Sequence, residues 1–488
     1  MDVPLPQTNF YANWRSTNES RFHLNERVNT EPSELLLQSV WQHQRLLRGQ
    51  LQTSDGQAVH VLHPGFLNKE AGPDFCDAVI QFGQNAPITG DIEIDLVPSG
   101  WTGHGHQGNP AYSKVILHVV WQGEGMRERP LPTLELKPFL DSPLEEIRSW
   151  FDSDAARDWP VEASGECCAA LSRLGAGEAS ELLNQAAEIR FLGKARAMEV
   201  RARQCGWEQA LWEGLFRALG YKQNVWPFQG VAERLPQLLN PKDSVLVLQA
   251  KFFGVSGLLP DTLPEGAEGY LRSLWDIWWR EREKYHELSL PSSIWHFNGL
   301  RPANLPQRRL ALAAYWLADG SLLSRLESWF TMDKPGDTLA ESLLECLQPP
   351  KDEFWSYHWS FRSTHLAKAH PLLGESRLAD LAVNVVLPWF WMRAHAGKND
   401  RLKSVACKRY FGWPVAQDNT TLKLARRRLF GKESVRWIKT AAQQQGMLQV
   451  VRDCCSQSNA ICSACPFPDL VRSWEVYCQS HPVESHKF

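Results

Sequence analysis

Residues 90–98 read GDIEIDLVP, in which apolar and acidic side chains alternate. Because the side chains of a strand point to its two faces in turn, this pattern predicts a strand with Asp91, Glu93 and Asp95 on one face. Further runs typical of strands flank it at QAVHVLHPG (57–65), PDFCDAVIQFG (73–83), KVILHVVWQ (114–122) and PTLEL (132–136). A helix is predicted before them, at SELLLQSVWQHQRLL (33–47), with Ser33 as its N-cap. Residues 31–140 therefore predict a compact α+β unit.

The chain changes character after about residue 140. Stretches with helical periodicity, such as residues 178–203 and 421–446, follow one another there, and strand patterns are few. We expect an α+β fold made of four parts in chain order: a polar arm (1–30), a small α/β core (31–140), a mainly helical region (141–445) and a cysteine-containing C-terminal module (446–488).

Charge and hydropathy narrow the class of protein. The 488 residues include 52 Lys and Arg against 55 Asp and Glu, a formal net charge of -3. This balance excludes a broadly basic coat for nucleic acid, although a local basic groove is compatible with it. No run approaches the ~18 consecutive apolar residues of a membrane helix, and the first residues do not resemble a secretory signal. We therefore expect a cytoplasmic protein without membrane association.

Carboxylates are the first candidate site. Pro73-Asp74 lies beside a predicted strand, Glu93 and Asp95 lie on the next strand, and Glu34 lies on the preceding helix. Acids on neighbouring strands and a packed helix can converge on one divalent cation such as Mg²⁺ or Mn²⁺, with Asp74 and Glu93 as its ligands. Such a cation supports hydrolysis of phosphodiesters. The alternative is structural, with Asp74 in a turn and Glu93 and Asp95 on the solvated face of an edge strand.

Histidines gather in the same unit. His104 and His106 lie in a glycine-rich loop after the acidic strand, where they could contact a phosphate or act as an acid. A His-x-His pair could equally bind zinc. His118 lies within the apolar strand that follows, and we expect it to be a core histidine bonded to the backbone.

The acidic residues together resemble the PD-(D/E)XK nuclease superfamily, whose pattern is a helix Glu, then Pro-Asp, then Glu/Asp-x-Lys on the following strand. Asp74 and Glu93 match its two metal-binding carboxylates, and Glu34 could match the helix acid. The resemblance implies a restriction-endonuclease-like core and metal-dependent cleavage of nucleic acid. Asp95 stands where the superfamily has Lys, which fits a member that manages without Lys or one that has lost catalysis.

Cysteines cluster near the C-terminus. Cys455, Cys462 and Cys465 follow the spacing Cys-x6-Cys-x2-Cys, which suits zinc or an iron–sulfur cluster. The run is similar to the iron–sulfur loop of helix-hairpin-helix DNA glycosylases, but the fourth cysteine position is Val471. The alternative is that these cysteines are small buried hydrophobes.

Basic residues on predicted helices could contact phosphates. They are Arg301, Arg308 and Arg309 in GLRPANLPQRRLA and Arg426 and Arg427 in TLKLARRRLF. Arginine binds phosphate through a bidentate fork, so these residues predict a DNA or RNA partner. For any one of these patches, a solvated helix face is the alternative.

The most extensive resemblance is to the uncharacterised bacterial domain-of-unknown-function family 2851. It covers HPGFLNKEAGPDFCDAVI, GDIEIDLVPSGWTGHGHQGNPAYSKVILHVVW, GLRPANLPQRRLA, NVVLP and QQQGMLQVVRDCC, from about residue 31 to the end. That family implies no established activity and usually has His at the position of Asp95. Our leading hypothesis is a metal-dependent nuclease-like phosphodiesterase. One alternative is a non-catalytic nucleic-acid-binding protein with a degenerate nuclease core. The other is a protein-interaction scaffold, which the 22 tryptophans and the near-zero net charge favour.

Overall fold

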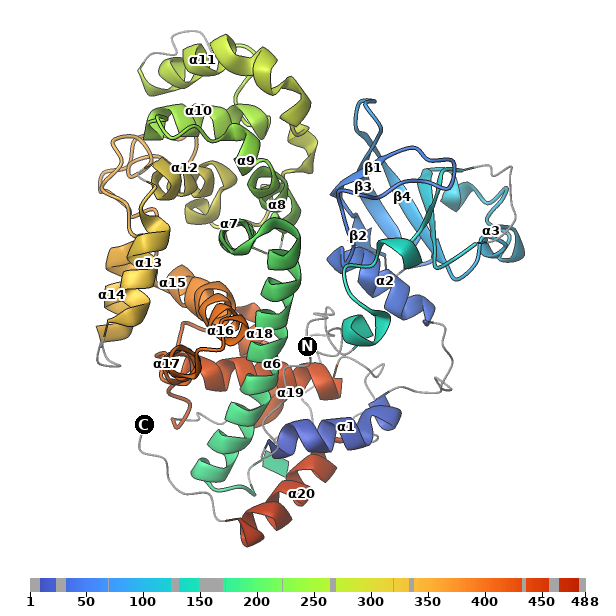
Figure 1. Ribbon diagram of the computed structural model, residues 1–488, viewed down its shortest axis with the longest axis vertical. Helices are drawn as coiled ribbons and strands as arrows, with labels where there is room; N and C mark the ends of the chain where they lie inside the picture. Colours follow the sequence, from blue (N-terminus) through green and yellow to red (C-terminus); the bar gives the residue numbers. More distant parts are fainter. Residues whose placement is uncertain are drawn as a thin grey trace.

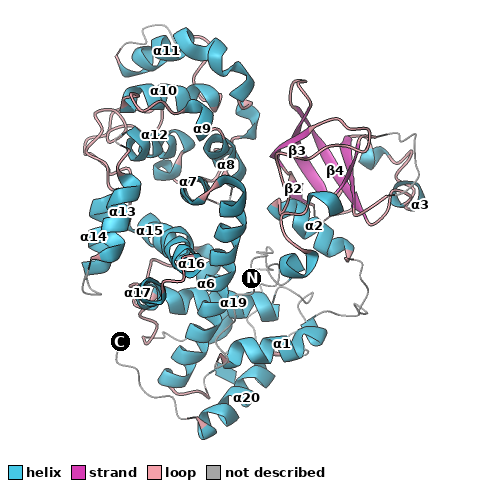
Figure 2. Ribbon diagram, in the orientation of Figure 1, coloured by secondary structure: helices cyan, strands magenta, loops and turns pink. Residues whose placement is uncertain are grey.

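The computed structural model describes residues 9–22, 32–68, 70–123, 131–148, 170–171, 173–221, 223–263, 269–318, 320–332, 338–431, 436–455 and 465–481. A small unit with a curled sheet lies beside a much larger helical region (Figure 1; Figure 2). The mixed α+β class predicted from the sequence is confirmed. Within the described ranges, no helix has the length and apolar character needed to cross a membrane.

The N-terminal unit combines one covering helix with a mixed sheet. Its elements are α2 (Glu34–His43), β1 (Val59–His63), β2 (Phe66–Leu67), β3 (Phe75–Phe82), β4 (Ile88–Asp95), α3 (Gly100–Gly103), η1 (Pro110–Tyr112), β5 (Val115–Val120), β6 (Thr133–Glu135) and η2 (Lys137–Phe139). The strand order is β1-β3-β4-β5-β6, with β2 paired to β3 outside this path. Strands β1, β3 and β4 pair antiparallel, whereas β5 runs parallel to β4 and β6 parallel to β5. A parallel pair needs a crossover, and the β4–β5 crossover carries α3 and η1.

Strand β4 is central in this sheet and both of its faces are covered. Asp91, Glu93 and Asp95 are only 8%, 6% and 3% exposed. The alternative that these acids form the solvated face of an edge strand is therefore wrong, because β3 and β5 pair with β4 on either side. The alternate residues Ile92 and Ile94 are fully buried in the core that this unit forms with α2.

Helix α2 begins where the sequence predicts. The Ser33 hydroxyl accepts a hydrogen bond from the Leu36 backbone N–H at 3.3 Å, which confirms Ser33 as the N-cap. Leu37, Val40 and Trp41 are fully buried and pack in the same core as the sheet. Their packing fixes the first turns of α2 against the end of β4, where the acidic residues lie.

The helical region contains the remaining elements. They are α1 (Phe10–Phe22), α6 (Ala176–Cys205), α7 (Trp207–Leu219), α8 (Val225–Glu233), α9 (Leu235–Leu238), α10 (Val245–Val255), α11 (Tyr270–Glu281), η3 (Arg282–Leu288), η4 (Ser292–Ile294), η5 (Pro302–Asn304), α12 (Pro306–Ala318), α13 (Leu322–Thr331), α14 (Leu339–Leu347), α15 (Glu375–Leu381), the π-helical η7 (Ala382–Val386), α16 (Leu387–Ala396), α17 (Asp400–Phe411), α18 (Thr420–Phe430), α19 (Ala441–Cys455) and α20 (Phe467–Ser480).

The 30-residue helix α6 runs through this region as its longest element (Figure 1). Phe191 belongs to the large core with α7 and α16, whereas Leu183 belongs to a second core with α19 and α20. The boundary predicted between residues 445 and 446 falls inside α19. The reason is that α19 is buried along most of its length against α6, so the cysteine-containing segment continues the helical region.

The N-terminal arm also differs from the expectation. Residues 1–30 are predicted to be a polar arm, but Phe10–Phe22 form α1, which lies beside α20 (Figure 1). Tyr11 is fully buried and its hydroxyl donates to Asp453 Oδ2 at 2.7 Å. The Phe10 ring packs 5.2 Å from that of Trp474. These aromatic side chains supply the apolar surface that docks α1 onto the C-terminal helices.

Candidate metal centre

The acids of the predicted site meet at the end of β4. Asp74 immediately precedes β3, and Phe75 pairs with Ile92, so Asp74 lies beside Glu93 on the next strand. The Asp74 backbone N–H donates to Glu93 Oε2 at 3.2 Å, and the backbone N–H of Ile94 donates to Asp74 Oδ2 at 3.0 Å. Gln38 of α2 donates to Asp74 Oδ1 at 2.8 Å. The strand pairing and the helix thus bring Asp74 and Glu93 together.

His118 belongs to the same cluster. Glu93 pairs with His118 in the parallel register of β4 and β5, which places both side chains on the acidic face of the sheet. His118 Nε2 lies 2.9 Å from Asp95 Oδ2, and both side chains are buried. His118 is a core histidine, as expected, but its Nε2 contacts the Asp95 carboxylate and not the backbone, because this register turns its ring toward Asp95.

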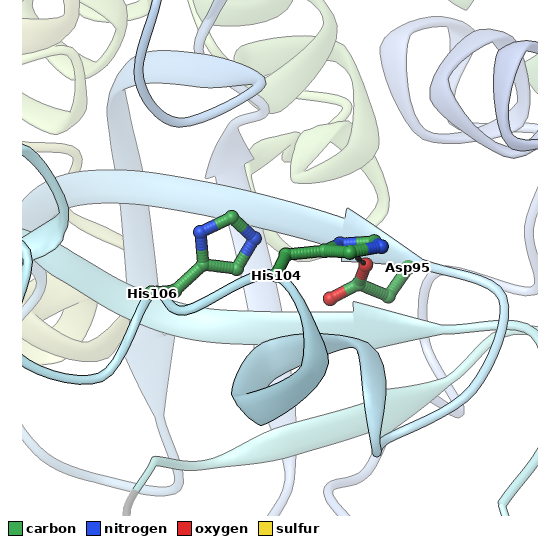
Figure 3. A group of neighbouring side chains, drawn as sticks. All are labelled: Asp95, His104 and His106. Carbon is green, nitrogen blue, oxygen red and sulfur yellow. Dashed lines mark ion pairs between the residues drawn. The ribbon is translucent and has the colours of Figure 1, made fainter.

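The loop between β4 and β5 supplies two more histidines. His104 Nδ1 lies 3.1 Å from Asp95 Oδ1, and His106 Nε2 lies 3.0 Å from Glu93 Oε1. Figure 3 shows His104 against the Asp95 carboxylate, with His106 on the same stretch of loop. The His104 side chain is 58% exposed and His106 is buried. The loop therefore presents one histidine to solvent and one to the interior of the site.

Three of these residues have the spacing of metal ligands. One donor atom each from Asp95, His104 and His106 lie within 4.8 Å of one another, the one such group of His, Cys, Asp or Glu in the part of the chain that the structure describes. His106 Nε2 is buried and no described group forms a hydrogen bond with it in good geometry. A cation would satisfy this nitrogen. Two imidazoles and a carboxylate form a donor set that suits zinc, manganese or iron.

Aromatic rings fix the buried histidine. The Tyr112 ring of η1 lies 4.0 Å from the His106 ring, centroid to centroid, at 32°. The Trp101 ring of α3 lies 5.4 Å from His106 and 5.6 Å from His118. These contacts limit rotation of the imidazoles, so little order has to be gained when a ligand binds.

Gly100 makes room for the Asp95 carboxylate. A Cβ at Gly100 would lie 2.4 Å from Asp95 Cγ, which is closer than non-bonded carbon atoms approach. Gly105, between the two histidines, has φ of +73°, a conformation that glycine adopts without strain. The glycines of this loop therefore contribute both close packing and the turn that separates His104 from His106.

Burial and mutual repulsion shift the pKa values of the acids. Burial, helped by the charges of Glu34 and Asp95 and opposed by the Ile94 N–H, raises the pKa of Asp74 to about 7. Burial, followed by the charge of Asp74, raises the pKa of Glu93 to about 8. Glu34 is exposed at the first position of α2, yet partial desolvation and the nearby Asp95 raise its pKa as well. Burial lowers the pKa of His106.

The cysteine prediction is only partly within the described residues. Cys455 is half-buried at the end of α19, and Cys465 precedes α20 with its Sγ 4.0 Å from the Cys454 carbonyl oxygen. Cys462 lies outside the described residues. A zinc or iron–sulfur site at Cys455, Cys462 and Cys465 stays a prediction.

Two of the predicted phosphate-binding arginines are structural. Arg308 and Arg309 are buried on α12. Arg308 donates to backbone carbonyls that include His358 at 3.1 Å, and Arg309 donates to the Leu372 carbonyl at 2.6 Å. The expectation that they contact nucleic acid is corrected, because their helix face points into the helical core.

The other predicted arginines lie nearer the surface. Arg426 forms an ion pair with Asp418 at 2.7 Å and is half-buried. Arg301 and Arg427 are exposed. A phosphate contact at these three residues stays a prediction.

Sequence reasoning assigned His118 to the core rather than to the site, and it missed Gln38, Tyr112 and Gly100. The position of His118 within an otherwise apolar strand was the available signal, but its side of the sheet depends on the register between β4 and β5. Gly100 and Tyr112 lie in the same glycine-rich loop as His104 and His106. No local pattern distinguishes them from ordinary loop residues.

Comparison with known proteins gives one match. The sequence matches the family described as Protein of unknown function (DUF2851) over residues 34–414, which includes the sheet, the histidine loop and most of the helical region. No curated protein and no solved structure matches the chain.

Proposed function

The chain belongs to the DUF2851 family, and we propose that its N-terminal unit is a divalent-metal-dependent phosphodiesterase that acts on DNA or RNA. One observation carries the proposal. Asp74, Glu93 and Asp95 converge with His104 and His106 at one end of β4, although they come from separate segments of the sequence.

The electrostatics favour a cation at this place. Burial first, and then the charges of Asp74, Asp95 and Glu34, raise the pKa of Glu93 to about 8. In the described part of the chain, Glu93 and Asp95 form ion pairs only with histidines. The predicted ligands Asp74 and Glu93 are not in the group with metal-ligand spacing. A divalent cation bound instead by Asp95, His104 and His106 would offset this repulsion. The imidazole donors favour Mn²⁺ or Zn²⁺ over Mg²⁺, which prefers oxygen ligands.

The residues around the ligands have roles that fit hydrolysis. A bound divalent ion would activate water and neutralise charge on a phosphodiester. Glu93 lies 3.0 Å from His106 Nε2, so its carboxylate would be placed to accept a proton from a water molecule beside a bound cation. His118 holds the Asp95 carboxylate in place, as an outer partner of a metal ligand does. The exposed His104 is the ligand that a phosphate would meet first.

The order of these residues supports a PD-(D/E)XK-like core. Glu34 opens the helix α2, Asp74 precedes β3, and Glu93 and Asp95 end the adjoining β4. That is the order of helix acid, Pro-Asp and Glu/Asp-x-Lys in the superfamily pattern. Asp95 replaces the Lys, and its pairing with two histidines gives that position a different task, that of anchoring imidazoles.

The test is a cleavage assay on the full chain with Mn²⁺, Zn²⁺ or Mg²⁺ and labelled single- and double-stranded DNA and RNA. We expect Asp74→Asn and Glu93→Gln to reduce metal-dependent cleavage by about a hundredfold or more. Asp91→Asn is the matched control. Asp91 is a buried acid on the same strand, but its Oδ1 accepts from the Asp77 backbone N–H at 3.2 Å, away from the histidines.

Three outcomes distinguish the alternatives. Equal cleavage by wild type and both site variants would contradict the proposed site. Salt-dependent binding of nucleic acid, with no cleavage product in the presence of any of the three metals, would favour a non-catalytic binding protein. The replacement of the superfamily Lys by Asp95 is the reason to consider this alternative. No binding at moderate salt would favour a scaffold.

A further inference from the structure

A cavity of about 460 Å³ lies where the end of α2 meets helices α6, α7, α8 and α15. This volume is within the range of about 300–1,000 Å³ that is usual for small-molecule sites. It is separate from the candidate metal centre, since none of the acids or histidines of that centre lines it.

Cationic side chains dominate the wall of the cavity. The lining cations are Arg45, Arg48, Lys194, Arg201, Arg217 and Arg377, against the acids Asp141, Glu213 and Asp380. Each acid already has an arginine partner within the wall, at 2.7 Å for Asp141, 2.6 Å for Glu213 and 3.1 Å for Asp380. Arg48 is also paired, with Glu233 at 3.0 Å just outside the lining. Counted with Glu233, the six cations still outnumber four acids, and an anionic ligand would balance the difference.

Arg377 is the residue that indicates a ligand. It is 5% exposed, and its Nη1 donates to the Ala218 carbonyl at 3.0 Å and lies 3.1 Å from Asp380 Oδ2. Its Nε and Nη2 form no hydrogen bond with any described residue and have almost no accessible surface, so a ligand reaches them only when a neighbouring side chain moves. These two nitrogens make up one edge of the guanidinium, whose parallel N–H bonds match two oxygens of a phosphate or carboxylate.

The surroundings hold that edge in place. The guanidinium carbon of Arg377 lies 3.3 Å from the centroid of the Tyr221 ring, so the plane of the group is restrained. Tyr221 has φ of 54°, an uncommon conformation for a residue with a side chain. The π-helical η7 follows α15 directly and places Asn384 and Val385 in the lining. π-helical turns are frequent at functional sites.

The rest of the wall suits an organic group. Met198, Ala210, Val225 and Val385 contribute apolar surface to the lining. The Trp226 ring lies 4.9 Å from the Arg217 guanidinium carbon, centroid to carbon. A bare phosphate ion would fill only a small part of 460 Å³.

We propose that this cavity binds a small organic phosphomonoester. Nε and Nη2 of Arg377 donate to two phosphate oxygens, and the organic part lies against the apolar wall. The dianionic phosphate balances the surplus of cations better than a single carboxylate does. This inference does not depend on the phosphodiesterase proposal, because it concerns a different cavity.

The test is calorimetric titration of the full chain with AMP, glucose 6-phosphate, inorganic phosphate and adenosine. We expect at least one of the two phosphomonoesters to bind more tightly than inorganic phosphate, and adenosine not to bind. Arg377→Gln and Arg377→Lys should each weaken that binding by roughly tenfold or more, because Lys keeps the charge but lacks the fork. No binding of either phosphomonoester at millimolar concentration would overturn the proposal. Affinity for inorganic phosphate equal to that for both esters would overturn the organic part of it.

Two further variants control for the possibility that an Arg377 variant does not fold. Lys194→Gln removes another cation of the lining and should weaken binding of the phosphomonoester, which provides the test if the Arg377 variants do not fold. Arg309→Gln removes an equally buried arginine that is outside the cavity and should leave the phosphomonoester affinity unchanged. If Arg309→Gln weakens binding as much as Arg377→Gln does, the effect is one of general stability and the assignment to Arg377 is wrong.

Discussion

The acidic centre at the end of β4 and the basic cavity beside α15 each contain a buried ionisable side chain whose charged form is disfavoured. In the centre, burial and neighbouring carboxylates raise the pKa of Glu93 to about 8. In the cavity, burial lowers the pKa of Arg377 to about 10. Each shift shows that the charged form is disfavoured where the protein holds it. The sign of the charge differs, so a cation would relieve one site and an anion the other.

Arg308 and Arg309 show that burial alone does not indicate a binding site. Burial lowers their pKa values to about 10 as well, but both terminal nitrogens of each guanidinium donate to oxygens of the protein. Arg377 differs because one complete edge of its guanidinium has no partner among the described residues. Arg308 and Arg309 each leave only Nε without a partner among the described residues, so a complete unsatisfied edge, more than buried charge, distinguishes Arg377 from them.

The largest effect on this comparison should come from Asp95→Asn. Asp95 contacts His104 and His118 through its two oxygens, so the change removes a charge and loosens both imidazoles. We expect Mn²⁺ affinity to fall by about a hundredfold or more in calorimetric titration of the full chain.

Asp91→Asn is again the control, since it removes a buried charge from the same strand without touching the histidines. Equal Mn²⁺ affinity in Asp95→Asn and wild type would show that the acidic centre does not bind a cation through Asp95. In that case the acidic centre would not be the cation site that the comparison with the basic cavity assumes.

Gly100→Ala should disturb the centre without changing any charge. The added Cβ would lie 2.4 Å from Asp95 Cγ, so either the carboxylate or α3 must move. We expect the free energy of unfolding to fall by about 1–3 kcal/mol, as overpacking usually costs, with weaker Mn²⁺ binding. Urea denaturation and calorimetry measure the two effects.

Gly103→Ala is the matched control for that substitution. Gly103 lies on the same short helix, and nothing lies within 4 Å of the Cβ it would gain. Its free energy of unfolding should stay the same or rise slightly. A loss as large as that of Gly100→Ala would mean that α3 tolerates no alanine, and the specific contact with Asp95 would not be the cause.

His118→Gln tests whether an outer partner of the centre matters. His118 reaches Asp95 at 2.9 Å from the neighbouring strand, and such second contacts usually contribute tenfold or more to metal affinity. We expect Mn²⁺ affinity to fall by about tenfold. The exposed His60 on β1 is the control, and His60→Gln should bind Mn²⁺ as wild type does. Unchanged affinity in His118→Gln would reduce its role to packing.

Much of the centre was predictable because its acids lie in local patterns. The alternation in residues 90–98 predicted one acidic face, and Ser33 predicted the start of α2, as the structure confirms. The convergence of Asp74 with Glu93 required the antiparallel pairing of β3 with β4, which adjacent strands in sequence commonly adopt. These features depend on contacts between near neighbours in the chain.

The remaining features depend on long-range contacts. His118 joins the site only through the parallel register of β4 and β5, and a shift of one residue would turn it to the other face. Arg308 and Arg309 look like a basic patch in sequence, but carbonyls from residues 355–372 surround them. The basic cavity combines residues from α2, α6 and α15, and no motif in the sequence connects these segments.

The pH dependence of the free energy of unfolding should show the smallest effect of the acidic centre. Asp74 and Glu93 have folded-state pKa values of about 7 and about 8, above those of the unfolded chain. Between about pH 4 and pH 8 the folded protein therefore binds more protons than the unfolded chain at these groups. Their contribution to the free energy of unfolding is complete below about pH 4 and decreases as pH rises through the folded pKa values. The slope is at most about 1.4 kcal/mol per pH unit for each proton.

Mn²⁺ should reverse this trend, because a bound cation competes with the protons and stabilises the ionised acids. Denaturation in urea between pH 5 and pH 8, with and without Mn²⁺, measures the difference. We expect Glu93→Gln to flatten the metal-free profile, since glutamine has no proton to release, whereas Asp91→Asn should keep the wild-type slope. A metal-free profile that rises with pH in this window, with the two variants alike, would mean that Asp74 and Glu93 are ionised in the folded state without a cation. The protein itself would then stabilise the ionised acids, and the acidic centre would not need a cation in the way that the basic cavity needs an anion.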